Sequence, residues 1–293
     1  MTGKRKQKKN IFAVLFSFPA LLIYTLFMIV PLFYAVYIST MEWTGAGNMK
    51  FIGIENYRFL FSFPDFWKII GNTGILILLH LLIQIPVAIL LAFLLLRTKR
   101  GFRFFRLVYF MPTVISATVM GLMFSILLNS DIGPVNVILH SLGMDWAVKN
   151  WLTDPKIVIF SVSLVLVWQY IGYHMSVILA GMQSLSKEII ESATIDGANS
   201  WQLCMRIVLP QIKDVLQVSV LFCVTGCLKA FEHSFIMTWG GPGVNSTYLA
   251  VYMYKSAFFN SELGKSSAIS VVIVACALVL YKICTMVFSS KEE

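Results

Sequence analysis

One polar stretch of the chain reads SLSKEIIESATIDGANSWQLCMRIVLP, residues 184–210, and it separates two strongly apolar runs. It is the longest polar and potentially helical segment in such a position. If the flanking runs cross a membrane, the stretch must lie outside the lipid and face an aqueous compartment. We therefore interpret it as a docking site for another protein.

The composition on either side of this stretch is that of an integral membrane protein. Of the 293 residues, 58% are hydrophobic and 13% are charged, and the mean hydropathy is +0.79. One soluble core cannot bury that much apolar surface. Several apolar runs reach the roughly 20 residues that a helix needs to cross the bilayer. Because lipid offers no partner for unpaired backbone groups, the sequence predicts an all-α integral membrane fold.

The basic residues carry topology information rather than a nucleic-acid site. The net charge is +9, but the basic residues lie beside apolar runs, and no basic face is interleaved with aromatic residues. The five cysteines form neither a disulfide framework nor a closely spaced metal pair. They are Cys204, Cys223, Cys227, Cys276 and Cys284.

The apolar runs predict one membrane domain with six transmembrane helices. The expected spans cover residues 11–38, 69–96, 105–128, 157–181, 215–237 and 266–288. The first run is too long for a signal peptide and lacks a small-residue cleavage site, so it stays as a span, kinked at Pro19 and Pro31. We expect a basic tail at 1–10, a six-helix transmembrane domain at 11–289 with a connecting loop at 184–213, and a short tail at 290–293.

The distribution of basic residues orients the bundle. Six spans put both termini on one side, and that side carries 15 of the 23 lysines and arginines. The other side carries seven, and Lys229 lies within a span. The positive-inside rule therefore predicts that both termini and the polar stretch are cytoplasmic. Four tryptophans agree with this orientation, because they fall in or beside the outer loops, where aromatic rings anchor at headgroups; they are Trp43, Trp67, Trp146 and Trp151.

Within the polar stretch the residue pattern predicts two short helices. Ser186 is an expected N-cap with Glu188 in the first turn, and Gly197 supplies the left-handed conformation that ends the first helix. A second helix is expected from about Ser200 to Ile207, closed by the Leu209-Pro210 pair. On these grounds an amphipathic connector resting in the headgroups and a protein-docking element are about equally supported.

A resemblance favours docking. Glu191 to Ala198 reads ESATIDGA, and Ile207 to Pro210 reads IVLP at the matching distance. This pattern resembles the EAA motif of permease subunits of binding-protein-dependent ABC importers, in which the loop is a coupling helix seated in a cleft of the ATPase subunit. Ser192 stands where the family usually has alanine. The resemblance implies ATPase-coupling roles for Leu185, Glu188, Glu191, Ala193, Asp196, Gly197, Ala198, Trp201, Arg206, Leu209 and Pro210.

A second segment narrows the resemblance to carbohydrate permeases. Residues 231–243 read FEHSFIMTWGGPG, with Thr247 beyond them, which is similar to the T-x-GGP…T signature of maltose- and multiple-sugar-type subunits. It implies a type I ABC importer fold and binding-protein contact through Gly240, Gly241, Pro242 and Gly243. The implied partners are a second homologous permease, two ATP-binding subunits, an extracellular substrate-binding protein, a sugar and the bilayer. The chain itself would bind no cofactor, since ATP and Mg would sit on the ATPase subunits.

Polar residues inside the spans are candidates for the substrate pathway. Lys229, Glu232 and His233 have the i, i+3, i+4 spacing of one helix face, which would let Lys229 pair with Glu232. Unpaired charges at mid-span cost about 2.5 to 3.5 kcal/mol, so they must face a polar interior or one another. Further candidates are Gln169, Tyr170 and Tyr173 in the fourth span, and Trp239. His80 and Gln84 share a face, for which a helix-to-helix hydrogen bond is the favoured role.

Other chemistry finds no support in the sequence. Gly264-Lys265-Ser266 echoes the end of a P-loop, but Phe259 occupies the position of the first glycine. His-Glu-x-x-His and Gly-x-Ser-x-Gly are absent, so neither a metal site nor a hydrolytic site is expected. The chain is predicted to be a transport subunit rather than an enzyme. The remaining alternatives are an ion-coupled secondary transporter acting alone and, with least support, a membrane-embedded enzyme.

Overall fold

The computed structural model describes residues 16–98 and 100–289. The expected basic tail at 1–10, the start of the first span at 11–15 and the tail at 290–293 lie outside the described residues. Five helices are long and apolar enough to cross a membrane, and one bent helix pair makes a sixth candidate. The five cover Phe16–Ser39, Pro64–Arg97, Val158–Gln183, Lys213–Thr238 and Leu263–Phe288. They agree with five of the six predicted spans.

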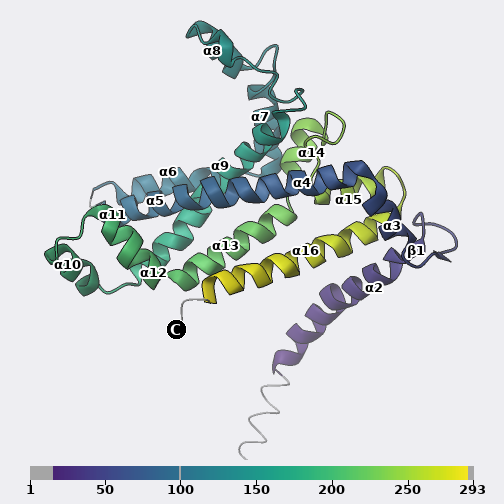
Figure 1. Cartoon of the computed structure of the whole chain (residues 1–293), viewed down its shortest axis with the longest axis horizontal. Helices are drawn as coiled ribbons and strands as arrows, with labels where there is room; N and C mark the ends of the chain where they lie inside the picture. The colour runs from purple at the N-terminus through teal and green to yellow at the C-terminus, as the bar shows by residue number, and fades with distance from the viewer. Residues whose placement is uncertain (1–15, 99, 290–293) are drawn as a thin grey trace, which may run out of the picture. The chain divides into compact units, whose positions relative to one another are not determined.

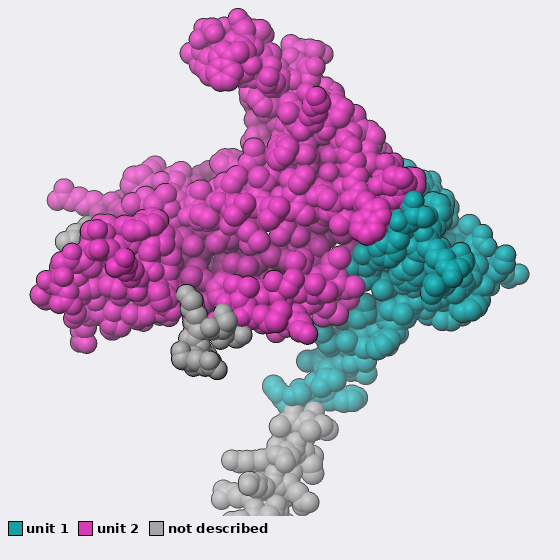
Figure 2. Space-filling view, viewed as in Figure 1, with its two compact units in different colours: residues 1–62, 253–272 teal, residues 63–252, 273–293 magenta. Residues whose placement is uncertain are grey.

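The chain divides into two compact units, coloured separately in Figure 2. Unit 1 comprises residues 1–62 and 253–272, and unit 2 comprises residues 63–252 and 273–293. α15 (Leu249–Phe258) and α16 (Leu263–Ser289) contribute residues to both.

Hydrogen bonds from the Asn56 side chain hold unit 1 together beside a very short β-ribbon. α2 (Val30–Ser39) leads into β1 (Met41–Glu42), which pairs antiparallel with β2 (Lys50–Phe51) before α3 (Glu55–Ser62). The buried Asn56 amide donates to the carbonyls of Ser39 and Met41, each at 2.9 Å. The fold is therefore helical except for this ribbon, which the all-α prediction did not include.

The tripeptide Gly264-Lys265-Ser266, which resembles the end of a P-loop, makes structural contacts in unit 1. A Cβ on Gly264 would lie 2.0 Å from the Met41 carbonyl oxygen, so only glycine fits this crossing. The Lys265 ammonium lies 2.6 Å from Glu262 and 4.0 Å from the Phe59 ring centroid. These contacts tie the start of α16 to the segments around it.

Unit 2 is built around α9 (Val158–Gln183), the most buried of the candidate spans. α4 (Pro64–Leu79), η2 (His80–Gln84) and α5 (Ile85–Arg97) form one long helix. α5 and α6 (Phe102–Val114) pack against α9, as Figure 1 shows. The chain continues through α7 (Ala117–Leu127), α8 (Pro134–Ser141) and η3 (Asp145–Ala147).

The third predicted span is not the straight helix expected at 105–128. α6 and α7 meet at a bend of 90°. Ile115 and Ser116 are extended (ψ 135° and 136°), which ends α6 two residues after Pro112. A Cβ on Gly172 of α9 would lie 2.0 Å from the Tyr109 carbonyl oxygen, so α6 and α9 cross at backbone contact. The bend at Ile115 therefore lies within two helical turns of this backbone crossing at Tyr109.

Three π-helical segments each end two residues before a proline. η1 (Thr25–Ile29) precedes Pro31, η2 precedes Pro86, and η4 (Leu203–Val208) precedes Pro210. Proline lacks an N–H and its ring clashes with the carbonyl four residues earlier. A wider turn relieves that clash without ending the helix. The predicted kink at Pro31 is thus part of a recurring device.

Much of the apolar surface of the described chain remains exposed. In the most apolar windows of the spans Phe16–Ser39 and Leu263–Phe288, only 6% of residues are buried. Exposed apolar surface on this scale requires lipid or a partner protein. This is the expected surface of a multi-pass membrane subunit.

Candidate functional site

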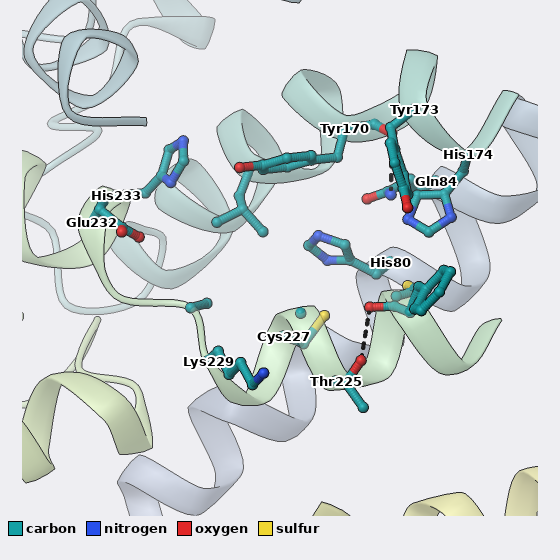
Figure 3. A pocket seen from close by; sticks show the side chains of 15 residues that line it. His80, Gln84, Tyr170, Tyr173, His174, Thr225, Cys227, Lys229, Glu232 and His233 are labelled. Carbon is teal, nitrogen blue, oxygen red and sulfur yellow. Dashed lines mark hydrogen bonds between the residues drawn. The ribbon is translucent and has the colours of Figure 1, made fainter. Parts of the chain in front are cut away.

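A cavity of about 400 Å³ lies among the candidate membrane-spanning helices of unit 2, and polar and apolar side chains both line it (Figure 3). The lining side chains come from η2, α9, α13 (Lys213–Leu228) and α14 (Glu232–Thr238). Its polar lining consists of His80, Gln84, Tyr170, Tyr173, His174, Thr225, Lys229, Glu232 and His233. Lys229 and Glu232 are exposed at its rim, so the cavity opens on the surface of the unit. Polar groups within apolar helices need a polar or hydrated surrounding, which this cavity provides.

The predicted single face of Lys229, Glu232 and His233 is wrong, because the fifth span is interrupted. α13 ends at Leu228, Phe231 has φ −136° and ψ −59°, and α14 begins at Glu232. No ion pair joins Lys229 to Glu232 in the part of the chain that the structure describes. The break nevertheless turns all three side chains to the cavity wall.

Gln169 connects the cavity wall to the bend in the third span. Its side-chain oxygen lies 2.7 Å from His233 Nε2, and its nitrogen donates to the Ile115 carbonyl at 2.9 Å. The Thr113 hydroxyl also donates to the Gln169 carbonyl at 2.9 Å. Gln169 is 1% exposed and does not line the cavity, in contrast to Tyr170 and Tyr173. It is a positioning residue rather than a wall residue.

The predicted helix-to-helix hydrogen bond is present for Gln84, whereas the bond of His80 stays within its own helix. His80 Nδ1 lies 2.9 Å from the Leu76 carbonyl oxygen, and Gln84 Nε2 lies 3.5 Å from that of Tyr170. Both side chains are also on the cavity wall, as Figure 3 shows. Sequence reasoning missed His174, whose Nδ1 lies 2.8 Å from the Ser219 hydroxyl. The sequence signal that could have identified His174 was a histidine directly after the candidate Tyr173.

The polar loop forms a second candidate site, on α10 (Lys187–Ile195). Gly197 has φ +82°, and the amides of Gly197 and Ala198 donate to the carbonyls of Thr194 and Ala193. These two bonds form a Schellman motif, which confirms the predicted glycine end of the helix. Ser186 occupies the N-cap position, but its side chain makes no capping hydrogen bond.

The second helix of the loop is longer than predicted. Asn199 and Gln202 form a capping box with two 2.9 Å bonds, a pattern that the sequence carried and the prediction missed. The helix runs through α11 (Ser200–Gln202), η4 and α12 (Leu209–Gln211). Pro210 therefore does not close it, because the π-helical turn accommodates the ring.

The loop is anchored by an apolar cluster and presents a polar outer face. Its buried members are Ala193, Leu203, Cys204, Val208 and Ile212, which pack with α5 and α9. Leu185, Ala198 and Leu209 pack against this cluster, whereas Glu188, Glu191, Asp196, Gly197, Arg206 and Pro210 are exposed. Trp201, one of the residues that the resemblance implies in coupling, is 69% exposed. The prediction missed Ile195, which is 85% exposed at the end of α10.

A hollow of about 440 Å³ lies on the outer face of this loop. It is lined by Glu188, Ile189, Ser192, Ala193, Asp196, Ala198 and Ile207. The carboxylates beside it take part in none of the ion pairs found among the described residues. Burial raises the pKa of the neighbouring Cys204 thiol, which keeps it protonated at neutral pH.

The glycine-proline segment after α14 is pinned by buried polar groups. The Thr247 hydroxyl donates to the Gly240 carbonyl at 2.7 Å, and the Asn72 amide donates to the Val244 and Thr247 carbonyls at 2.8 and 3.1 Å. Gly240 has φ +76° and is buried, Gly241 and Pro242 are half-buried, and Gly243 is exposed. Trp239 is 50% exposed, and its ring lies 4.2 Å from that of Phe235.

Residues 84–290 match the family described as the inner membrane component of binding-protein-dependent transport systems. The chain belongs to this family. The probable ABC transporter permease YurN of Bacillus subtilis is 33% identical over 98% of this permease and 99% of its own length. The lactose transport system permease LacF of Rhizobium radiobacter is 31% identical, over 95% of each chain. A solved bacterial ABC transporter for alginate contains a chain with the same fold, with a TM-score of 0.82, 24% identity and 98% of each chain covered.

Family membership makes the protein a multi-pass inner-membrane permease, a transport subunit and not an enzyme. It replaces the two alternatives of a secondary transporter acting alone and a membrane-embedded enzyme. Within residues 16–98 and 100–289, no group of three or more histidine, cysteine, aspartate or glutamate side chains could hold a metal ion.

Proposed function

We propose that this permease moves a sugar or oligosaccharide inward through the unit 2 cavity, driven by ATP hydrolysis on separate subunits. The polar and aromatic lining of that cavity carries the proposal. Tyr170 and Tyr173 offer rings for the apolar faces of a pyranose and hydroxyls for its polar edges. A relative over 30% identical is named for lactose transport, which supports the substrate class.

Energy would enter through the loop at 184–213. The charge distribution supports a cytoplasmic placement of this loop and of both termini. There the exposed carboxylates of α10 and the apolar tip at Ile195 would meet one of two ATP-binding subunits, which would hold ATP and Mg. Closure of those subunits would push α10 and, through the apolar cluster, move α5 and α9.

The remaining partners would meet the permease at the open cavity and at the outer loop. A second, homologous permease would supply the other half of the pathway, since the rim residues Lys229 and Glu232 are exposed. An external substrate-binding protein would contact the segment from Gly240 to Gly243, next to Trp239. Because Thr247 and its hydrogen bond to the Gly240 carbonyl are buried, only the outer edge of the segment would touch that protein.

Uptake of labelled saccharides by cells tests the transport proposal. A strain without this chain would be complemented and supplied with ¹⁴C-labelled lactose, raffinose, maltotriose or arabinotriose. We expect uptake of at least one to depend on the chain and to fall when Tyr170 or Tyr173 becomes alanine. Tyr34→Ala, at an exposed tyrosine of unit 1, is the control. Uptake that is unchanged in the strain without the chain would contradict the proposal.

Co-purification of the ATPase tests the coupling role. Glu191→Lys reverses a charge on the exposed face of α10 and should abolish ATPase binding while membrane insertion persists. Glu42→Lys makes the same charge change in unit 1 and should retain binding. Equal ATPase recovery with both variants would refute the assignment of the loop.

A further inference from the structure

Two residues that line the cavity each carry a buried side-chain atom without a hydrogen-bond partner. In the described chain, four buried side-chain atoms lack one, and two of these, Gln84 Oε1 and His233 Nδ1, belong to residues that line the cavity. Gln84 is 0% and His233 is 1% exposed. Such groups cost about 1 to 3 kcal/mol each when nothing satisfies them, so each requires an explanation.

The partners of His233 determine the role of its free nitrogen. Gln169 donates through its nitrogen to the Ile115 carbonyl, which can only accept, so its oxygen must be the atom facing His233. That oxygen accepts from His233 Nε2, which therefore carries the proton. In a neutral imidazole the other nitrogen is then a bare acceptor. His233 Nδ1 thus presents a lone pair.

His80 presents an acceptor by the same reasoning. Its Nδ1 faces the Leu76 carbonyl, so Nδ1 is the donor and Nε2 carries the lone pair. In Figure 3 the His80 ring projects into the middle of the space between the labelled side chains. Gln84 donates through its nitrogen toward the Tyr170 carbonyl, which leaves its oxygen as the acceptor. His174 is different, because the serine hydroxyl beside it can donate or accept.

We propose that the cavity recognises a neutral, hydroxyl-rich ligand by accepting hydrogen bonds from its hydroxyls at His80 Nε2, Gln84 Oε1 and His233 Nδ1. The proposal rests on the transport function above and specifies its chemistry. A carboxylate would meet three lone pairs and is disfavoured. Lys229 and Glu232 carry opposite charges at the rim, so they add no net preference for a charged ligand. Ether analogues, which cannot donate, would leave buried acceptors unpaired and be rejected.

The protonated nitrogens can be observed directly, without a ligand. The chain has four histidines, so ¹⁵N-histidine labelling of the full chain in lipid gives few signals for solid-state NMR, assigned by substituting each histidine singly. We expect the Nε2–H form at His233 and the Nδ1–H form at His80. Gln169→Leu should remove the preference at His233 and leave His80 unchanged. The opposite protonation at either ring, or doubly protonated rings at neutral pH, would overturn the proposal.

Matched substitutions test the acceptors in transport. The probe is whichever of the four saccharides above the wild-type system takes up fastest. His80→Gln can place an oxygen where Nε2 lies, whereas His80→Leu cannot. We expect the glutamine variant to stay within about twofold of wild type, and the leucine variant and Gln84→Leu to fall about fivefold, for one hydrogen bond. Equal losses in the two His80 variants would overturn the proposal. If no saccharide is transported, the function proposed above fails, and the NMR result alone decides this inference.

Discussion

The crossing of α6 and α9 at Gly172 predicts that Gly172→Ala destabilises unit 2. The added Cβ would lie 2.0 Å from the Tyr109 carbonyl oxygen and 2.6 Å from its carbon. Non-bonded contacts of a Cβ are at least about 3 Å, so the helices must separate by about 1 Å, an overpacking strain of about 1 to 3 kcal/mol. Both partners are backbone atoms, and no side chain can swing away to relieve the contact.

The same movement would disturb the hydrogen bonds of Gln169, one turn away on α9. Its bonds with Thr113 and Ile115, both at 2.9 Å, lie on the far side of the crossing. Losing them adds about 1 kcal/mol each. The higher helix propensity of alanine returns about 1 kcal/mol. The net cost is about 3 kcal/mol, a fall in Tm of roughly 6 to 12 °C for a unit of this size.

The buried cysteines supply the assay for Gly172→Ala. Four of the five thiols are buried, so a thiol-reactive dye reports unfolding of the purified chain during heating. Gly74→Ala in α4 is the matched control, because a Cβ there meets no atom within 4 Å. We expect the control to melt at or above the wild-type temperature. A Gly172→Ala variant that melts with the control would refute the backbone contact.

Three further outcomes follow from the loops. Asn72→Leu removes two bonds that hold the glycine-proline segment and should lower Tm by about 4 °C, at about 1 kcal/mol per bond, whereas the exposed Asn260→Leu should not. Ile195→Ser should leave Tm unchanged but weaken ATPase binding at least about tenfold, measured by titration of the ATPase, because docking would bury an apolar side chain. Mass spectrometry can follow the reaction of Cys204 with maleimide, which at pH 7 should be at least about tenfold slower than that of an exposed Gln211→Cys thiol. The reason is that the raised pKa of Cys204 leaves little thiolate. The reaction rate of Cys204 should therefore rise with pH above neutrality.

Local patterns predicted the parts of the fold that depend on nearby residues. Apolar run length located five long spans to within a few residues, and Gly197 marked the end of α10, because both signals act over one or two turns. The capping box of Asn199 and Gln202 was equally readable and was missed. The prediction that Pro210 ends the second helix of the loop was wrong, because a π-helical turn before Pro210 accommodates the proline ring.

The interruptions of the third and fifth spans were not readable from local patterns. Apolar composition is the same in a straight helix and in one that bends at Ile115 or breaks before Glu232. What holds the broken ends is distant in sequence: Gln169 reaches Ile115 across 54 positions and His233 across 64. A single sequence contains no signal for such pairings.

Local sequence patterns also do not show which polar residues line the cavity and which ones only hold a lining residue in place. Polar residues inside apolar spans identified the region correctly as a group, since each must find a polar environment. Gln169 and Tyr170 are adjacent in sequence, yet the first faces His233 and Ile115 and the second faces the cavity. The bend at Ile115 exposes the carbonyl that orients Gln169, and Gln169 in turn orients His233. Under the recognition proposed above, the bent third span would contribute to the pathway without lining it, by setting which nitrogen of His233 a ligand would meet.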